Sequence, residues 1–134
     1  MNKLTNQEAF DIVASHLARQ KTQCLSAQNG CLYYGEDGKK CAIGVLISQD
    51  EYRKSFEGDS AVNIADHISC LENVSRSLLS ALQLAHDSHK PEHWSLYLSR
   101  IAEGYGLQFD VDAWQKKFDA PIPKDDSNEI IQTE

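Results

Sequence analysis

The sequence predicts a mainly helical α+β fold, a compact bundle of about five helices with one small β-hairpin and an acidic, disordered tail. Apolar residues recur at helical spacing through most of the chain. The one stretch rich in strand formers is short, residues 31–47, which read CLYYGEDGKKCAIGVLI. A chain of 134 residues with 41% hydrophobic residues suits a single core. We therefore expect one domain over residues 1–118, followed by a tail over residues 119–134.

The first helix is expected to begin after Thr5 and to end near Gln20 or Lys21. Thr5 can accept a hydrogen bond at the N-cap and Glu8 can reach back to it, which is the pattern of a capping box. His16 lies beside the apolar stripe and is expected to be half-buried. That stripe follows helical spacing and consists of Phe10, Val13, Ala14 and Leu17.

The hairpin is expected near residues 31–44. Its first strand would run from Cys31 to Tyr34, because these side chains favour strands. Gly35 to Gly38 would form the turn, since Asp-Gly suits a tight hairpin connection. The return strand would begin at Lys39 and pass into a buried helical turn over residues 42–47.

Helix-start signals divide the rest of the chain. Ser48 and Glu51 form a second capping-box pattern that predicts a short helix over residues 49–56. The later starts are Ser60, Asn73 or Ser75, Pro91, and Asp110 or Asp112. The apolar residues expected on these helices are Val62, Ala65, Ile68, Leu71, Leu78, Leu79, Leu82, Ala85, Trp94, Leu98, Ile101, Ala102, Tyr105, Val111, Trp114 and Phe118, and those from Val62 to Leu71 are expected to line an inner face.

The charge distribution gives no strong signal for nucleic-acid binding. The formal net charge is −7, and the tail holds five acids against Lys124 alone. The folded part is therefore nearly balanced, whereas a nucleic-acid binder usually carries a basic face. Four basic residues come nearest to such a face, and they are better interpreted as a solvated rim. They are Lys39, Lys40, Arg53 and Lys54.

The sequence also predicts a cytoplasmic protein without a membrane segment. Its first residues lack an apolar signal-peptide core, and no apolar run approaches the ~20 residues of a membrane span. The cysteines are then expected to be reduced thiols. No close pair of cysteines supports a zinc site, so we expect buried thiols and no metal or cofactor, with a four-cysteine site as the alternative for Cys24, Cys31, Cys41 and Cys70.

Cys41 is the candidate for a nucleophile. A helix beginning there would lower the pKa of its thiol through free N–H groups and the helix dipole. His86 could act as the base, with Asp87 to orient it. The apolar neighbours of Cys41 favour the other interpretation, in which its thiol belongs to the core.

The histidines allow a second site. His67, the pair His86-Asp87 and Asp110 follow the order of metal ligands in hydrolases with an HD signature. The simpler interpretation places His89 and His93 in a solvated connection between helices.

Aromatic and basic side chains around the hairpin form a candidate binding surface. Its residues are Tyr33, Tyr34, Lys39, Lys40 and Arg53. The alternative is that the tyrosines pack against cross-strand neighbours.

These motifs resemble those of a group of small, functionally uncharacterised proteins from proteobacteria and their phages. The resemblance covers about residues 8–107 and implies a phage or mobile-element setting more than a reaction. It rests on Cys31-Leu-Tyr33-Tyr-Gly35, Gly38-Lys-Lys-Cys41-Ala-Ile-Gly44-Val-Leu46-Ile47, Leu82, His86-Asp87, Trp94 and Tyr105-Gly-Leu107.

Two functions remain open at this level. The first is a small, non-enzymatic protein that binds a protein partner, such as an inhibitor of a bacterial defence system or an immunity-like protein. The second is a cysteine-dependent hydrolase or transferase that uses Cys41, His86 and Asp87.

Overall fold

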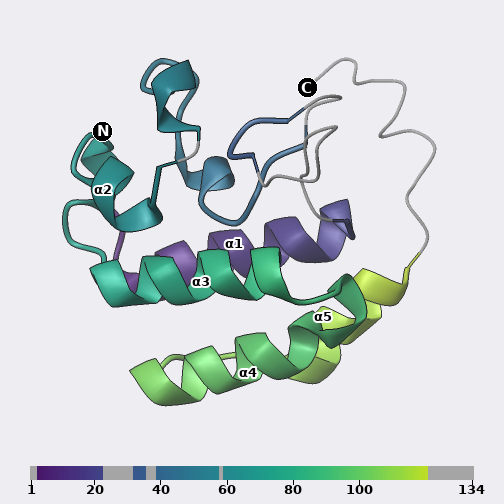
Figure 1. Cartoon of the computed structure of the whole chain (residues 1–134). Helices are drawn as coiled ribbons and strands as arrows, with labels where there is room; N and C mark the ends of the chain where they lie inside the picture. Colours follow the sequence, from purple (N-terminus) through teal and green to yellow (C-terminus); the bar gives the residue numbers. More distant parts are fainter. Residues whose placement is uncertain (1–2, 23–31, 36–38, 58, 121–134) are drawn as a thin grey trace.

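Helices form the framework of the computed structural model, which describes residues 3–22, 32–35, 39–57 and 59–120. Within these residues the mainly helical class is confirmed, and Figure 1 shows the α-helices and the shorter 3₁₀ turns between them. The α-helices are α1 (Asn6–Gln20), α2 (Ala61–Ala65), α3 (Arg76–Ser88), α4 (Trp94–Tyr105) and α5 (Val111–Asp119). The 3₁₀ turns are η2 (Gly44–Leu46), η3 (Lys54–Phe56), η4 (Ser69–Leu71) and η5 (Pro91–His93).

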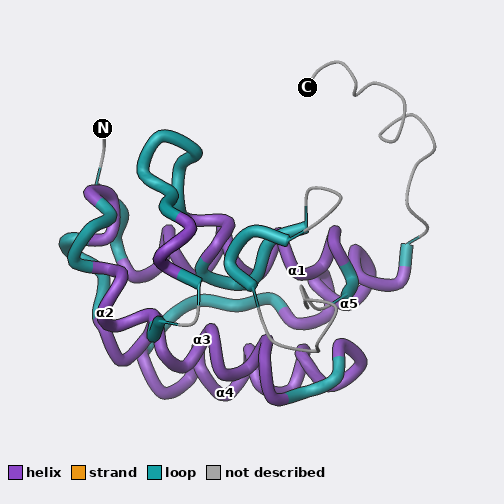
Figure 2. Tube along the Cα trace, turned by 45° about the horizontal axis from the view of Figure 1, so that its top comes forward, coloured by secondary structure: helices purple, strands orange, loops and turns teal. Residues whose placement is uncertain are grey.

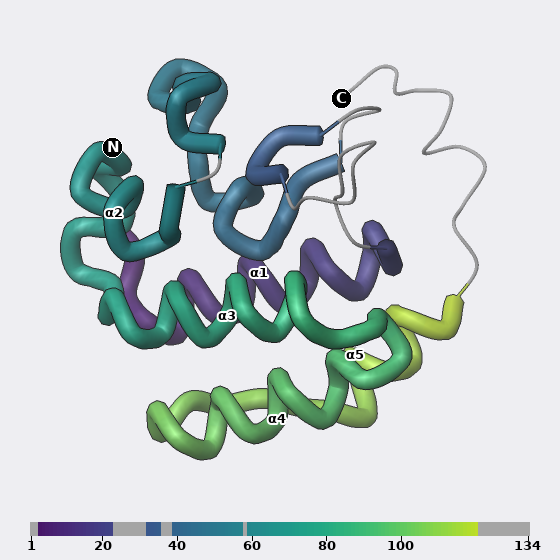
Figure 3. Tube along the Cα trace, viewed as in Figure 1, coloured from purple at the N-terminus to yellow at the C-terminus, as the bar shows by residue number. Residues whose placement is uncertain are grey.

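Helix α3 lies at the centre of the arrangement. It packs against α2 and α4 and also contacts α1, while α1 packs against α5 and η2. The loops and turns of residues 39–57 lie together on one side of α1 and α3 (Figure 3). The core fills the space between these layers, and its largest fully buried side chains include Phe10, Leu17, Ile43, Ile47, Leu79, Leu82, Trp94 and Leu98.

The start of α1 follows from a local hydrogen-bond exchange that the sequence predicts. The Glu8 amide donates to the Thr5 hydroxyl at 3.1 Å, and the Thr5 amide donates to the Glu8 carboxylate at 2.9 Å. The capping box is therefore confirmed, and so is the end of the helix at Gln20. The apolar stripe of α1 is buried as expected.

Three further helix starts are also confirmed. Ser60 caps α2, Ser75 caps α3 and Asp110 caps α5, each by accepting an amide three residues later. Pro91 opens η5, which leads directly into α4, because a proline at this position loses no helical hydrogen bond.

Hydrogen bonds join helix α5 to helix α1, which precedes it by about ninety residues in the chain. The indole nitrogen of Trp114 donates to the Ala14 carbonyl at 2.7 Å. Lys21 adopts a left-handed conformation with φ of 63° at the end of α1, and its ammonium donates to the Lys117 carbonyl at 3.0 Å. These bonds hold α1 and α5 together on the side away from α2.

The predicted hairpin is wrong for the described residues, which contain no strand (Figure 2). One isolated antiparallel bridge joins Tyr34 and Lys40. The Glu57 carboxylate accepts the Tyr33 amide at 2.9 Å and the Tyr34 amide at 3.2 Å. A longer ladder would pair the Tyr33 amide with the Cys41 carbonyl, which instead accepts the Val45 amide at 3.3 Å. After Cys41 the chain turns into η2, in agreement with the expected buried helical turn.

The predicted helix over residues 49–56 is confirmed only at its end, where η3 covers Lys54–Phe56, while residues 49–51 form a turn. The Glu51 amide donates to the Ser48 hydroxyl at 3.3 Å, but Glu51 then uses its carboxylate to accept the Ser69 amide at 3.0 Å. The carboxylate therefore caps η4 instead of opening a helix of its own. Val62, expected on the inner face of α2, is 40% exposed, because this short helix buries its other side.

No helix among the described residues is long and apolar enough to cross a membrane. The predicted tail lies largely in residues 121–134, outside the described part of the chain.

Candidate functional site

The Cys41 thiol lies in the core beside η2. The Gly44 amide donates to its sulfur at 3.2 Å, and the thiol donates to the side-chain oxygen of Gln83 at 3.2 Å. Cys41 has no exposed surface. Burial raises the pKa of the thiol strongly, and the amides of Gly44 and Ile43 only partly oppose this. The expectation that a helix start would lower this pKa is therefore wrong, because desolvation outweighs a three-residue turn.

Close backbone packing explains the glycine next to this thiol. A Cβ atom at Gly44 would lie 1.9 Å from the carbonyl oxygen of Tyr33. A side chain cannot fit there without a shift of the backbone, so Gly44 allows the Tyr33 segment to lie directly on η2.

Gln83, which the sequence analysis missed, connects this turn to α3. Its side-chain oxygen accepts the Ile43 amide at 3.1 Å, in addition to the Cys41 thiol. Its side-chain nitrogen donates to the two carboxylate oxygens of Asp87 at 2.8 and 2.9 Å. The signal available in the sequence was the i, i+4 spacing of Gln83 and Asp87 on one helix face.

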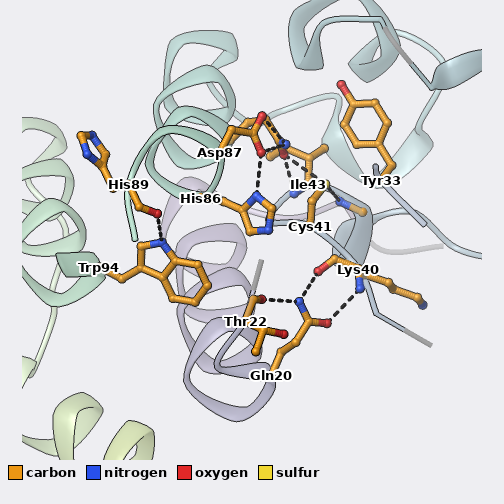
Figure 4. Close-up of polar contacts among 12 residues, drawn as sticks. Gln20, Thr22, Tyr33, Lys40, Cys41, Ile43, His86, Asp87, His89 and Trp94 are labelled. Carbon is orange, nitrogen blue, oxygen red and sulfur yellow. Dashed lines mark hydrogen bonds and ion pairs between the residues drawn. The ribbon is translucent and has the colours of Figure 1, made fainter. Parts of the chain in front are cut away.

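His86 and Asp87 do form a pair, as Figure 4 shows. The imidazole Nδ1 lies 2.6 Å from the Asp87 Oδ1, and Nδ1 carries the hydrogen because a carboxylate can only accept. His86 is fully buried and stacks on Trp94 with ring centroids 5.8 Å apart. Asp87 reaches Cys41 through Gln83, so the predicted residues gather around a glutamine.

One side of this network opens to a pocket between α2 and α3, called here the α2–α3 pocket. Its volume is about 230 Å³. The Asp87 side chain is 28% exposed, and Leu84 is 60% exposed. The pocket is lined by Tyr33, Asp59, Ser60, Ala61, Ser80, Gln83, Leu84 and Asp87.

The α2–α3 pocket has a negative character. Asp59 accepts the Asn63 side-chain amide at 2.8 Å and the Ser60 amide at 2.9 Å, and these bonds lower its pKa. Burial is the main cause that raises the pKa of the Tyr33 hydroxyl, and Cys41 raises it next, followed by Asp87, Asp59 and Glu57. The lining includes no lysine, arginine or histidine among the described residues.

The residues predicted to bind a partner divide into buried and exposed groups. Tyr33 is buried and its hydroxyl donates to the Asp59 carbonyl. The Tyr34 ring stacks on Tyr52 at 4.1 Å and has the Lys40 ammonium 4.6 Å from its centroid. Its hydroxyl donates to the Ile47 carbonyl. Lys39 and Arg53 are exposed.

The described residues contain no group of three or more histidine, cysteine or acidic side chains arranged to hold a metal. His67, His86-Asp87 and Asp110 are all described, and they do not come together as the alternative HD-type metal site would require. His67 stacks on Phe56, and Asp110 caps α5. Cys70 is buried, whereas Cys24 and Cys31, which belong to the alternative four-cysteine site, lie outside the described residues.

No protein-family model, curated protein or solved structure matches this chain. The assignment of a function therefore depends on the geometry of the site.

Proposed function

We propose that this protein acts without catalysis, by binding a protein partner through the α2–α3 pocket and its rim. The observation that carries this proposal is Leu84, which is 60% exposed on the rim of a pocket that two aspartates also line. Among the large hydrophobic side chains in the described part of the chain, it is the most exposed.

The size of the pocket supports a protein partner over a cofactor or a large metabolite. Pockets for drug-sized ligands usually enclose about 300–1,000 Å³, whereas this pocket measures about 230 Å³. Such a volume suits one side chain inserted from a partner. Protein interfaces commonly combine an inserted side chain with an apolar contact and a polar rim.

The buried thiol argues against the cysteine-dependent enzyme. A nucleophilic cysteine must meet its substrate and needs a thiolate at neutral pH. Cys41 has no exposed surface and its pKa is raised. The arrangement of Cys41, Gln83 and Asp87 therefore supports a structural role, in which Gln83 joins η2 to α3.

The biological setting that we propose is that of an inhibitor or immunity-like protein. This part of the proposal rests on the resemblance to small proteins of proteobacteria and their phages. An inhibitor of this kind acts by binding to its partner and blocking it, and the α2–α3 pocket with one exposed leucine on its rim is sufficient for such binding.

Photo-crosslinking tests the proposed function. A benzoylphenylalanine is placed at position 84 and, as a matched control, at position 96. Leu96 is also an exposed leucine, but it lies on α4 outside the pocket lining. In lysate of the cells that encode the chain, we expect a crosslinked protein of defined mass from position 84 only.

Identical crosslinking patterns from the two positions, or none from either, contradict the proposal. If position 84 does give a defined product, the crosslinked partner is purified and its binding to the wild-type chain is measured with pure components. The Leu84→Ala variant is expected to weaken this binding, whereas Leu96→Ala is expected to leave it unchanged.

A further inference from the structure

We propose that the α2–α3 pocket receives an arginine side chain of the partner, while an apolar residue of the same segment packs on Leu84. This inference rests on the proposed function, and it adds the chemistry by which the partner is recognised. The observations that carry it are the two carboxylates in the pocket, the absence of a basic side chain from its described lining, and the exposed leucine on its rim.

The first carboxylate is held in place before any ligand arrives. Asp87 accepts two hydrogen bonds from Gln83, at 2.8 and 2.9 Å, and one from His86 at 2.6 Å. Gln83 is itself fixed by the Ile43 amide, and His86 is fully buried. A carboxylate with a fixed orientation loses little conformational freedom on binding, which favours affinity.

The second carboxylate lies at the start of α2. Asp59 accepts hydrogen bonds from Ser60 and Asn63, and these lower its pKa, so it is charged at neutral pH. Asp59 and Asp87 both line the same small pocket, where their negative charges favour a cation.

An arginine fits this distribution of acceptors better than a lysine does. The guanidinium group has five N–H donors in a planar fork, whereas an ammonium group is a compact point charge. The pocket offers carboxylates from two elements and the hydroxyls of Ser60 and Ser80. The aliphatic part of an arginine can also lie along Leu84, as long cationic side chains do on apolar surfaces.

Titration of the full chain with short peptides, followed by ¹⁵N–¹H NMR, tests the inference. The probe is N-acetyl-Leu-Arg-Leu-amide, in which a leucine on each side allows either direction of the backbone. Its controls contain lysine or citrulline in place of arginine, and citrulline keeps the shape but has no charge. We expect saturable shifts at Ser60, Ser80, Gln83, Leu84 and Asp87, with a dissociation constant on the order of 1 mM.

The expected order of affinity is arginine, then lysine, then citrulline. Asp59→Asn keeps the hydrogen bonds at the start of α2 but removes a charge. It is therefore expected to raise the dissociation constant of the arginine peptide by roughly tenfold at most. Ser80→Arg places a tethered guanidinium at the pocket and is expected to abolish the shifts. Gln49→Arg adds the same charge at an exposed position outside the lining and is the matched control.

Equal binding of the arginine and citrulline peptides overturns the inference. So do shifts confined to other surfaces, or a Ser80→Arg variant that binds as the wild type does. The proposed function stands in these cases if position 84 still crosslinks a partner. If the arginine peptide binds in the pocket but no partner crosslinks at position 84, the pocket is a site for free cationic ligands, and the protein-partner form of the inference is rejected.

Discussion

Replacement of Gln83 by alanine tests the network that joins η2 to α3. The substitution removes the acceptor of the Ile43 amide and of the Cys41 thiol, and both residues are fully buried. A buried donor left without a partner costs about 1–3 kcal/mol. The lost bonds to Asp87 add about 1 kcal/mol, and the higher helix propensity of alanine returns a few tenths of a kcal/mol. We expect a loss of about 2–4 kcal/mol in the free energy of unfolding.

Urea denaturation followed by far-UV circular dichroism measures this loss. The matched control is Gln115→Ala, because Gln115 also donates to an aspartate four residues later, Asp119, at 3.0 Å, but on the exposed side of α5. The control is expected to lose less than about 0.5 kcal/mol. If Gln83→Ala costs no more than Gln115→Ala, the buried hydrogen bonds of Gln83 do not stabilise the fold as argued.

Two further predictions concern the same region. Gly44→Ala is expected to lower the free energy of unfolding by about 3 kcal/mol or more, because its Cβ would lie 1.9 Å from the Tyr33 carbonyl oxygen. Gly104→Ala in α4, where a Cβ meets no neighbouring atom within 4 Å, is expected to gain up to about 1 kcal/mol, and similar effects of the two substitutions in urea denaturation would refute the packing argument. The Cys41 thiol is expected to resist iodoacetamide at neutral pH until the protein unfolds, because it is buried and its pKa is raised. Peptide mass spectrometry of the alkylated native protein measures this, and rapid labelling of Cys41 would favour the cysteine-dependent enzyme instead.

The sequence predicted those parts of the fold that depend on neighbouring residues. The caps at Thr5, Ser60, Ser75 and Asp110 each involve an amide three residues away, so the local sequence contains both partners. The apolar stripes of the longer helices were predictable for the same reason, since their spacing follows the helical period.

Predictions failed where a distant side chain replaced a local partner. Glu57 accepts the amides of Tyr33 and Tyr34 from more than twenty residues away, and the hairpin is reduced to one bridge. Glu51 matched the pattern of a capping box, but its carboxylate accepts the amide of Ser69. Strand and helix propensities carry no information on such long-range competition.

The candidate site divides in the same way. The sequence by itself determined that His86 and Asp87 are neighbours in the chain and that Cys41 belongs to an apolar stretch. Only the tertiary structure decided that Gln83 connects them, that burial raises the pKa of the thiol, and that Asp87 opens onto a pocket beside Leu84. The physical reason is that burial and hydrogen bonding between segments forty residues apart depend on how the helices pack, which no local pattern specifies.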